Sequence, residues 1–316
     1  MSFFRGMGSF FKKLYRNKSA FVSFIVVMLY IVTAVGVEVY SISCEKRHAI
    51  PAYAVEHPDK IFAPPSQEHW LGTDYLGRDC FLRAVGGIST AVKVGVTASV
   101  IAAVIGVTLG LLAGFYGGKL DSFIMWLYST FAAMPTLLFI LAFALLFTKD
   151  YLAEELTMPL KICAKALNTE PGMLAVYLAI GLTGWVALCR IARAETMKLK
   201  NQTFVQAAKV SGVSNRVIIF RHILPNIMHL VIIYFTLRFA YAVMTEVLVS
   251  YLGLGVQSAP SWGIMISDGQ ERLWRGVWWE VAAASGFMFI LVLSLNLLGD
   301  GLRDISDPKN FVSDKG

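Results

Sequence analysis

VGVTASVIAAVIGVTLGLLAGF occupies residues 94–115 and has no charged side chain. A transmembrane helix needs about 20 consecutive, mostly apolar residues, so this run is long enough to cross a bilayer. Backbone groups in hydrocarbon must bond within their own segment, which favours a helix. No stretch alternates apolar and polar residues as β-barrel strands do. The run therefore predicts an all-α integral membrane protein.

The rest of the chain supports this fold class. Hydrophobic residues make up 56% of the chain and charged residues 16%, and the mean hydropathy is +0.62, whereas a soluble domain has about 25% charged residues. Five other runs are apolar and long enough to span, two of them at the short end. They are residues 21–37, 123–147, 173–189, 227–252 and 281–298. Together with 94–115 they predict six transmembrane helices in one domain.

The charge distribution predicts the orientation of the chain. The first 20 residues contain Lys and Arg but no acidic residue. Six spans place both termini on one side, together with the 116–122 turn and the 190–226 segment, and this side carries most of the 28 Lys and Arg residues. By the positive-inside rule this side, with both termini, is cytoplasmic. The net charge of +7 is thus explained by topology, which argues against nucleic acid as a partner.

The first span could be either a membrane anchor or a cleaved signal peptide. Its basic flank fits both, but its apolar run of about 17 residues is longer than the usual 7–15 of a signal peptide. Ser41-Ile42-Ser43-Cys44 only loosely resembles a lipoprotein cleavage box. A retained anchor is the favoured interpretation.

Two local features predict how the spans pack. Gly106, Gly110 and Gly114 lie four residues apart, so they share one helical face and allow a neighbouring helix to approach closely. The alternative is that glycine is simply frequent in membrane spans. Pro135 is predicted to kink the third span at Met134-Pro135.

The polar segment 203–225 separates the fourth and fifth apolar runs. Thr203–Ser211 has good helix formers, and Gly212 should end that helix because glycine tolerates the left-handed conformation found at helix C-termini. Ser214 or Asn215 can cap a second short helix. The segment therefore predicts a helix-turn-helix on the cytoplasmic surface.

The second short helix is expected to be amphipathic. Val217, Phe220 and Leu224 recur at i, i+3 and i+7 and should form its apolar face. Pro225 is expected to end this helix and to open the fifth span, since proline suits a first helical turn. Such a helix can rest on its own protein or offer a surface to a partner, and the residues alone leave both readings open.

The same segment carries a resemblance to a known family. Gln206-Ala207-Ala208, Gly212 and Leu224-Pro225 resemble the EAA signature of ATP-binding-cassette importer permeases. Two positions depart from it, because Gln206 replaces the leading Glu and His222 stands where Ile is expected. His222-Ile223-Leu224-Pro225 is similar to the peptide-permease branch.

Further motifs, in family order, resemble the second permease subunit of dipeptide, oligopeptide and nickel importers. They are His69–Asp74 (HWLGTD), Leu76–Asp79 (LGRD), Leu111–Gly118 (LLAGFYGG), Leu182–Trp185 (LTGW), Tyr251–Gly255 (YLGLG), Pro260–Gly263 (PSWG) and Asn296–Asp304 (NLLGDGLRD). The HWLGTDYLGRD segment could contact a binding protein or simply fold the external loop.

The resemblance implies a type I ABC importer permease fold in the cytoplasmic (inner) membrane of a prokaryote. It implies a second homologous permease subunit, two cytosolic ATP-binding-cassette ATPases and an external substrate-binding protein as partners. The chain has no G-x-x-x-x-G-K-[ST] motif, since Gly117-Gly118-Lys119 is followed by Leu120. ATP and magnesium are therefore expected on the ATPases, and no cofactor is expected in this chain.

The resemblance also assigns a role to the 203–225 segment, which in the family is a coupling helix seated in a groove of the ATPase. The expected coupling residues are Val205, Gln206, Ala207, Ala208, Gly212, Ser214, Arg216, Leu224 and Pro225. The expected division of the chain is 1–20 as an interfacial lead-in, 21–42 as the first anchor, 43–87 as an external loop, 88–303 as the permease core with coupling loop 195–225, and 304–316 as a cytoplasmic tail.

Charged residues inside spans are costly and usually face a cavity or each other. Lys93, Arg238 and Glu246 are therefore candidates for a translocation path, where they would line water or grip peptide termini. The structural alternatives are that Lys93 snorkels to the interface and that Arg238 pairs with Glu246.

Other function classes find little support. An integral-membrane enzyme needs clustered catalytic groups, but the five histidines are scattered, and neither a catalytic nor a metal site is expected. An ion-driven carrier would be expected to show inverted repeats, and none is visible. The four cysteines form no metal-binding pattern; free buried thiols are favoured, and a disulfide among Cys44, Cys80 and Cys163 stays open. The cargo, whether a dipeptide, a longer peptide, a nickel complex or another small solute, is left open.

Overall fold

The structure is a computed structural model that describes residues 15, 17–148, 158, 161–165, 169, 171–255 and 259–306. Most of the expected lead-in, most of residues 148–172 between the third and fourth apolar runs, and the tail beyond residue 306 lie outside the described residues. The long elements are α2 (Lys18–Lys46), α3 (Cys80–Tyr116), α4 (Gly118–Ala133), α5 (Thr136–Thr148), α7 (Pro171–Lys200), α10 (Leu224–Tyr251) and α12 (Trp279–Ser306). Shorter helices are α8 (Thr203–Val210), α9 (Asn215–Val217) and α11 (Trp262–Gln270), and a π-helical turn covers Ile218–Ile223. Within the described ranges no strand occurs.

The predicted all-α membrane fold is confirmed. Five helices are long and apolar enough to cross a bilayer, and the pair α4 and α5 makes a sixth span if it is counted as one. The predicted kink at Met134-Pro135 is a sharp break, because these two helices meet at 86°. Met134 has extended backbone angles, as expected for a residue that precedes proline.

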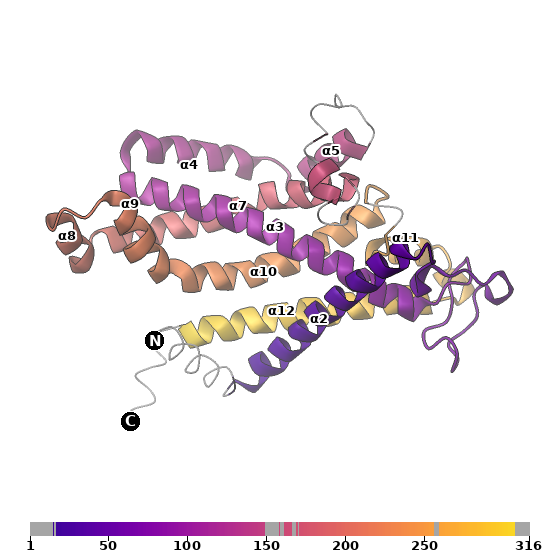
Figure 1. Cartoon of the computed structure of the whole chain (residues 1–316). Coiled ribbons are helices and arrows are strands. Elements are labelled where there is room, and N and C mark those ends of the chain that lie inside the picture. Colours follow the sequence, from indigo (N-terminus) through magenta and orange to yellow (C-terminus); the bar gives the residue numbers. More distant parts are fainter. Residues whose placement is uncertain are drawn as a thin grey trace.

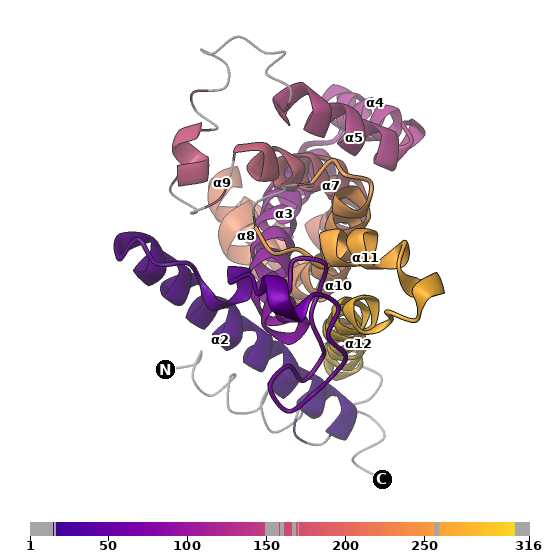
Figure 2. The same cartoon turned by 90° about the vertical axis from the view of Figure 1, so that its right-hand side faces the viewer.

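Helices α3, α7, α10 and α12 run between two ends of the molecule, whereas α5 lies at 86° to α4 (Figure 1). One end carries α8 and is called the α8 end. The other, called the loop end, carries the 47–79 segment and α11 and faces the viewer in Figure 2. Helices α2 and α4 lie on opposite sides of α3 in both views.

Helices α3 and α7 make the most extensive contact of any helix pair in the described part of the chain, and the glycine face of α3 contributes to it. A Cβ at Gly110 would lie 2.7 Å from the carbonyl oxygen of Cys189, and one at Gly114 would lie 2.6 Å from that of Arg193. These separations leave no room for a side chain. The predicted close approach is therefore confirmed, and it stabilises a pair of membrane helices through van der Waals contact.

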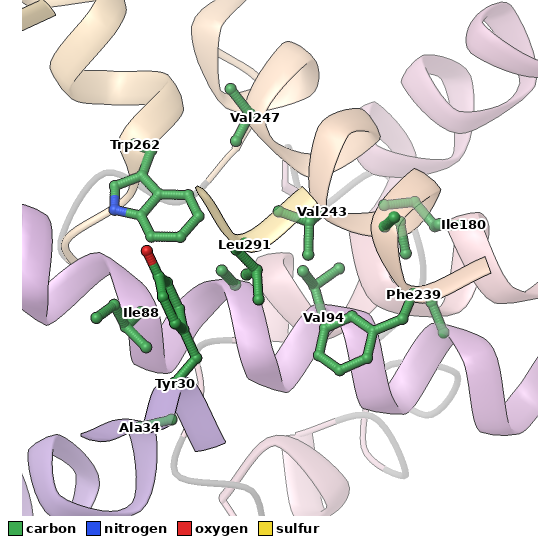
Figure 3. Close-up of a cluster of buried hydrophobic side chains, with 14 of the residues drawn as sticks. Tyr30, Ala34, Ile88, Val94, Ile180, Phe239, Val243, Val247, Trp262 and Leu291 are labelled. Atoms are coloured by element: carbon green, nitrogen blue, oxygen red, sulfur yellow. The ribbon is translucent and has the colours of Figure 1, made fainter. Parts of the chain in front are cut away.

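A buried core joins α2, α3, α7, α10, α11 and α12 (Figure 3). The hydroxyl of Tyr30 donates a hydrogen bond to the carbonyl of Phe287 at 2.9 Å, and the indole of Trp262 donates to the carbonyl of Ala84 at 2.8 Å. Buried aromatic groups with a polar atom normally find such partners. These bonds fix α2 to α12 and the start of α11 to α3.

Asp74 organises the loop end. Its side chain is fully buried and accepts hydrogen bonds from the amides of Leu76 and Arg78 at 2.9 Å. Its other oxygen accepts from the guanidinium of Arg83 at 2.5 Å, and Arg83 also pairs with Glu280 at 3.0 Å. The HWLGTDYLGRD segment is thus fixed to α3 and α12, which favours loop folding as its role.

The four cysteines are free thiols. Cys44, Cys80 and Cys189 are buried, whereas Cys163 is exposed. The expectation of free buried thiols holds for Cys44, Cys80 and Cys189 but not for the exposed Cys163; no disulfide links the cysteines in the described residues.

Candidate functional site

Helix α8 is a short, largely exposed helix with one deeply buried residue. Val205 is completely buried and packs in a cluster with Leu111 and Phe115 of α3 and Ala192 of α7, while Ile218, Ile219, Ile223 and Ile227 complete the cluster. Gln206 and Ala207 are exposed, and Val210 at the tip is 90% exposed. The helix is therefore anchored on one side to several spans and open on the other.

Gly212 ends α8 as predicted. Its φ of +76° is in the left-handed region, and the amide of Val213 bonds the carbonyl of Ala208 while that of Gly212 bonds the carbonyl of Lys209. This is the Schellman arrangement of helix C-termini. No atom lies within 4 Å of a Cβ built on Gly212, so the position requires glycine for its backbone conformation alone.

The chain after Ser214 departs from the expectation. The second helix does not end at Pro225, because α9, the π-helical turn and α10 form one continuous helix, Asn215–Tyr251. Ser214 is the N-cap residue as expected, without a side-chain hydrogen bond. The π-helical turn accommodates the proline inside the helix, and the side chain of Asn226 donates to the carbonyl of His222 at 2.6 Å.

The predicted apolar face of this segment packs only partly against this chain. Val217 and Phe220 are 41% and 66% exposed, and Leu224 is only partly buried. The buried side chains are instead Ile218, Ile219 and Ile223. The prediction assumed a separate α-helix, whereas the wider π-helical turn rotates the residues that face α3 and α7.

Two lysines hold α8 over the end of α3. The ammonium groups of Lys200 and Lys209 lie 5.9 Å and 5.3 Å from the ring centroid of Phe115, within the range of cation–π attraction. The side-chain amide of Gln206 donates to the carbonyl of Lys200 at 3.0 Å. A carboxylate has no hydrogen to donate, so glutamine makes a bond here that a Glu at position 206 could not make.

At the same end of the bundle, α7 is also tied to α4. The guanidinium of Arg193 makes two hydrogen bonds to the carboxylate of Asp121, at 2.5 Å and 2.6 Å. Arg190 lies over the ring of Tyr128 at 4.7 Å. Such two-point contacts fix geometry as well as charge, so α7 links α8 to both α3 and α4.

The three charges predicted for a translocation path have different partners. Lys93 pairs with Glu38 of α2 at 2.6 Å. Arg238 is 9% exposed and donates to the carbonyl of Ile180, while its guanidinium lies over the ring of Tyr241. Glu246 is 2% exposed and accepts hydrogen bonds from Ser250 and Ser261.

The alternative of an Arg238–Glu246 ion pair is wrong for the described residues, where each has other partners. The partner of Lys93 was missed from the sequence. Glu38 directly follows the first apolar run and Lys93 directly precedes the second. Both positions lie at the external side of the membrane in the predicted topology. Their opposite charges could therefore have been used to predict the ion pair.

Comparison with known proteins identifies the family. Residues 106–312 match the family described as binding-protein-dependent transport system inner membrane component. Similar proteins include the oligopeptide transport system permease protein OppC of Bacillus subtilis, 34% identical over 93% of this chain and 86% of that protein. The dipeptide transport system permease protein DppC of the same species is 32% identical over 94% and 84%. OppC of Escherichia coli K12 is 37% identical over 77% and 73%.

This chain belongs to the family of inner-membrane components of binding-protein-dependent transport systems. It is a multi-pass permease subunit of the inner membrane and not an enzyme. The resemblance to ABC importer permeases found in the sequence is confirmed. Membership implies ATPase and substrate-binding protein partners.

Proposed function

We propose that this chain is a permease subunit of an ATP-driven importer of di- or oligopeptides. The peptide permeases among its relatives support this cargo over nickel complexes. The functional unit would contain a second homologous permease, two ATP-binding-cassette ATPases that bind ATP and magnesium, and one external binding protein. Both termini and the α8 end would face the cytoplasm, in agreement with the basic residues of the 190–226 segment.

The coupling site in this proposal is the exposed surface of α8 and the start of α9. Ala207 and Ala208 would permit close docking of the ATPase, and Ser214 and Arg216 would lie at the rim of the contact. One observation carries the proposal: the single buried residue of α8, Val205, packs against residues of α3, α7 and the π-helical turn. A force on α8 would therefore reach several spans at once.

Transmission through the bundle would then be rigid. The glycine contacts hold α7 against α3, and the Arg193–Asp121 pair holds α7 against α4. Packed elements of this kind switch between discrete arrangements instead of bending. We propose that the core, residues 88–303 with coupling loop 195–225, rocks between inward-open and outward-open states when the ATPases close.

Fewer observations bear on the translocation path than on the coupling site. Lys93 stays a proposed path residue, since its side chain is 25% exposed. Arg238 and Glu246 stay predictions as well. In this single subunit both side chains are buried, with a nitrogen of Arg238 bonded to the Ile180 carbonyl of α7 and Glu246 bonded to Ser250 and Ser261, so exposure to a path would require α10 to move.

Reconstitution tests the proposed function. The chain is co-reconstituted in liposomes with its second permease and ATPases, and the loaded binding protein is added outside. We expect uptake of labelled peptide that requires ATP and both ATPases. Uptake driven by an ion gradient without ATPases would support a secondary carrier, and uptake of nickel complexes without peptides would contradict the peptide cargo.

A further inference from the structure

A cavity of about 530 Å³ opens near the loop end between α2, α3, α7 and the segment before α11. Its volume lies within the range of about 300–1,000 Å³ that is typical of small-molecule sites. The cavity lies at the opposite end of α3 from Phe115 and α8, so it is separate from the proposed coupling site.

The walls of this cavity carry opposite charges. Glu38 and Glu45 line it from α2 and lie seven residues apart, hence on one face of that helix. Lys93 of α3 and Lys165 line it from other segments. The cavity therefore has an acidic wall and a basic wall, an arrangement complementary to a molecule with an ammonium group and an anionic group.

The contact between these walls is accessible. Lys93 and Glu38 pair at 2.6 Å, and their side chains are 25% and 23% exposed. Partly exposed ion pairs contribute little net stability, so a ligand with both charges could exchange the Lys93–Glu38 contact for ion pairs of its own. Ser89 donates to the carboxylate of Glu38 at 2.9 Å and orients it.

Tyr177 adds a hydrogen-bonding group. It lines the cavity and is 1% exposed, and its hydroxyl has no hydrogen-bond partner in the described residues. Other hydroxyls of the lining are used, since Ser41 bonds Tyr53 at 3.1 Å and Thr90 bonds the carbonyl of Pro260 at 2.8 Å. Buried polar groups nearly always have a partner, so the Tyr177 hydroxyl is a group for a ligand to use.

We infer that this cavity binds the charged termini of a short peptide, with the ammonium group at the acidic wall of Glu38 and Glu45 and the carboxylate at Lys93 and Tyr177. Glu45 lies about 10 Å along α2 from Glu38, which is close to the length of an extended tripeptide. The inference rests on the proposed peptide cargo and names the site that receives it inside this subunit. A zwitterionic lipid headgroup such as phosphatidylethanolamine shares the same chemistry, and the test separates the two sources.

The experiment uses the full complex in phosphatidylcholine liposomes and a photoreactive tripeptide, alanyl-benzoylphenylalanyl-alanine. We expect crosslinks to this chain that excess tri-alanine suppresses and that N-acetyl-tri-alanine amide does not. Tyr177→Phe should raise the peptide concentration for half-maximal crosslinking roughly tenfold, the loss of one hydrogen bond to a charged group. Tyr116→Phe at the α8 end is the matched control and should leave it unchanged.

A second variant guards against misfolding. The double variant Glu38→Lys with Lys93→Glu exchanges the charges of the two walls but can still form an ion pair. We therefore expect normal assembly of the complex. Crosslinking of the peptide should be at least tenfold weaker. Wild-type peptide uptake is measured in the same liposomes. If uptake is normal but neither variant changes crosslinking, the inference is overturned and the proposed function stands; if the wild type imports no peptide, the proposed function itself fails.

A further experiment tests whether the cavity binds a lipid headgroup instead of a peptide. The same crosslinking is repeated in liposomes that contain phosphatidylethanolamine with a photoreactive headgroup. Crosslinks from this lipid that depend on Tyr177 and that tri-alanine does not displace would assign the cavity to lipid and overturn the inference. Displacement of the lipid by tri-alanine would support it.

Discussion

The carbonyl oxygen of Cys189 lies 2.7 Å from the point that a Cβ of Gly110 would occupy. Helix α3 thus contacts the backbone of α7, not only its side chains. This contact lies between the buried cluster beneath α8 and the core around Tyr177, so it connects the proposed coupling site to the rest of the bundle.

The first prediction concerns this contact. Gly110→Val should separate α3 from α7, because its side chain would overlap backbone atoms, and overpacking costs about 1–3 kcal/mol. We expect a lower midpoint of thermal denaturation for the purified complex in detergent. Gly36→Val in α2 is the control, since no atom lies within 4 Å of a Cβ there; equal midpoints for both variants would contradict the close packing.

The second prediction separates coupling from backbone strain. Gly212 and Gly276 have φ of +76° and +81°, and neither has an atom within 4 Å of its Cβ position. Valine at either position should cost about 1–3 kcal/mol of strain. We expect Gly212→Val to lower ATP-driven uptake at least tenfold with normal membrane insertion, and Gly276→Val at the loop end to have little effect. Similar uptake by the two variants would contradict a coupling role for the turn at the end of α8.

The third prediction concerns Gln206. Gln206→Glu removes the amide that donates to the carbonyl of Lys200. A typical hydrogen bond contributes about 0.5–1.5 kcal/mol, so the α8 anchor should loosen and uptake should fall severalfold. Gln202→Glu at the exposed N-cap of α8 is the control. Uptake at or above the wild-type rate in Gln206→Glu would show that charge at this position matters more than the bond.

The fourth prediction concerns the loop end. Asp74→Asn should leave Arg78 and Arg83 without their shared carboxylate, and removal of one partner of a buried pair costs about 3–5 kcal/mol. The 57–79 segment should then detach, so that the buried Cys80 reacts with a maleimide in a Cys163→Ala background. Asp59→Asn, at an exposed position of the same segment, should leave Cys80 protected. Protection of Cys80 in Asp74→Asn would be inconsistent with this role.

The fifth prediction is a pH dependence. Burial raises the pKa of Asp268 above its usual 3.8, against the opposing effect of Arg83, Arg272 and Arg78. The folded state therefore holds this proton more tightly than the unfolded state, so its contribution to stability falls as the pH rises from about 3.8 through the raised pKa. The thermal midpoint of the wild type relative to Asp268→Asn should fall over that range. A difference that grows with pH would contradict the raised pKa.

The sequence predicted the features that depend on local physics. Long uncharged runs must be helices in a bilayer, so the spans were visible directly. Pro135 lacks an amide hydrogen and marked the break between α4 and α5, and the four-residue spacing of the glycines marked the helix face that packs closely. Gly212 needed only its own backbone preference to end α8.

The remaining features depend on tertiary contacts. Pro135 predicts a break between α4 and α5, but it does not determine the angle of 86° between them, which also depends on packing. Continuity through Pro225 arises because Ile218, Ile219 and Ile223 are buried against α3 and α7 and select the π-helical turn. Tyr177 and Lys93 line the same cavity from different helices, and the Tyr177 hydroxyl lacks a partner among the described residues. Spacing along the chain carries no sign of either feature.

The central claim is that α8 contacts an ATPase and transmits its movement. The most direct measurement is cysteine crosslinking from Val210→Cys, the most exposed apolar position of α8, in a Cys163→Ala background of the assembled complex. We predict crosslinks to cysteines placed in a surface groove of the ATPase, with yields that differ between the ATP-bound and nucleotide-free states. Absence of any crosslink to the ATPase in both states, or labelling of this cysteine only from the outside of the cell, would contradict the account.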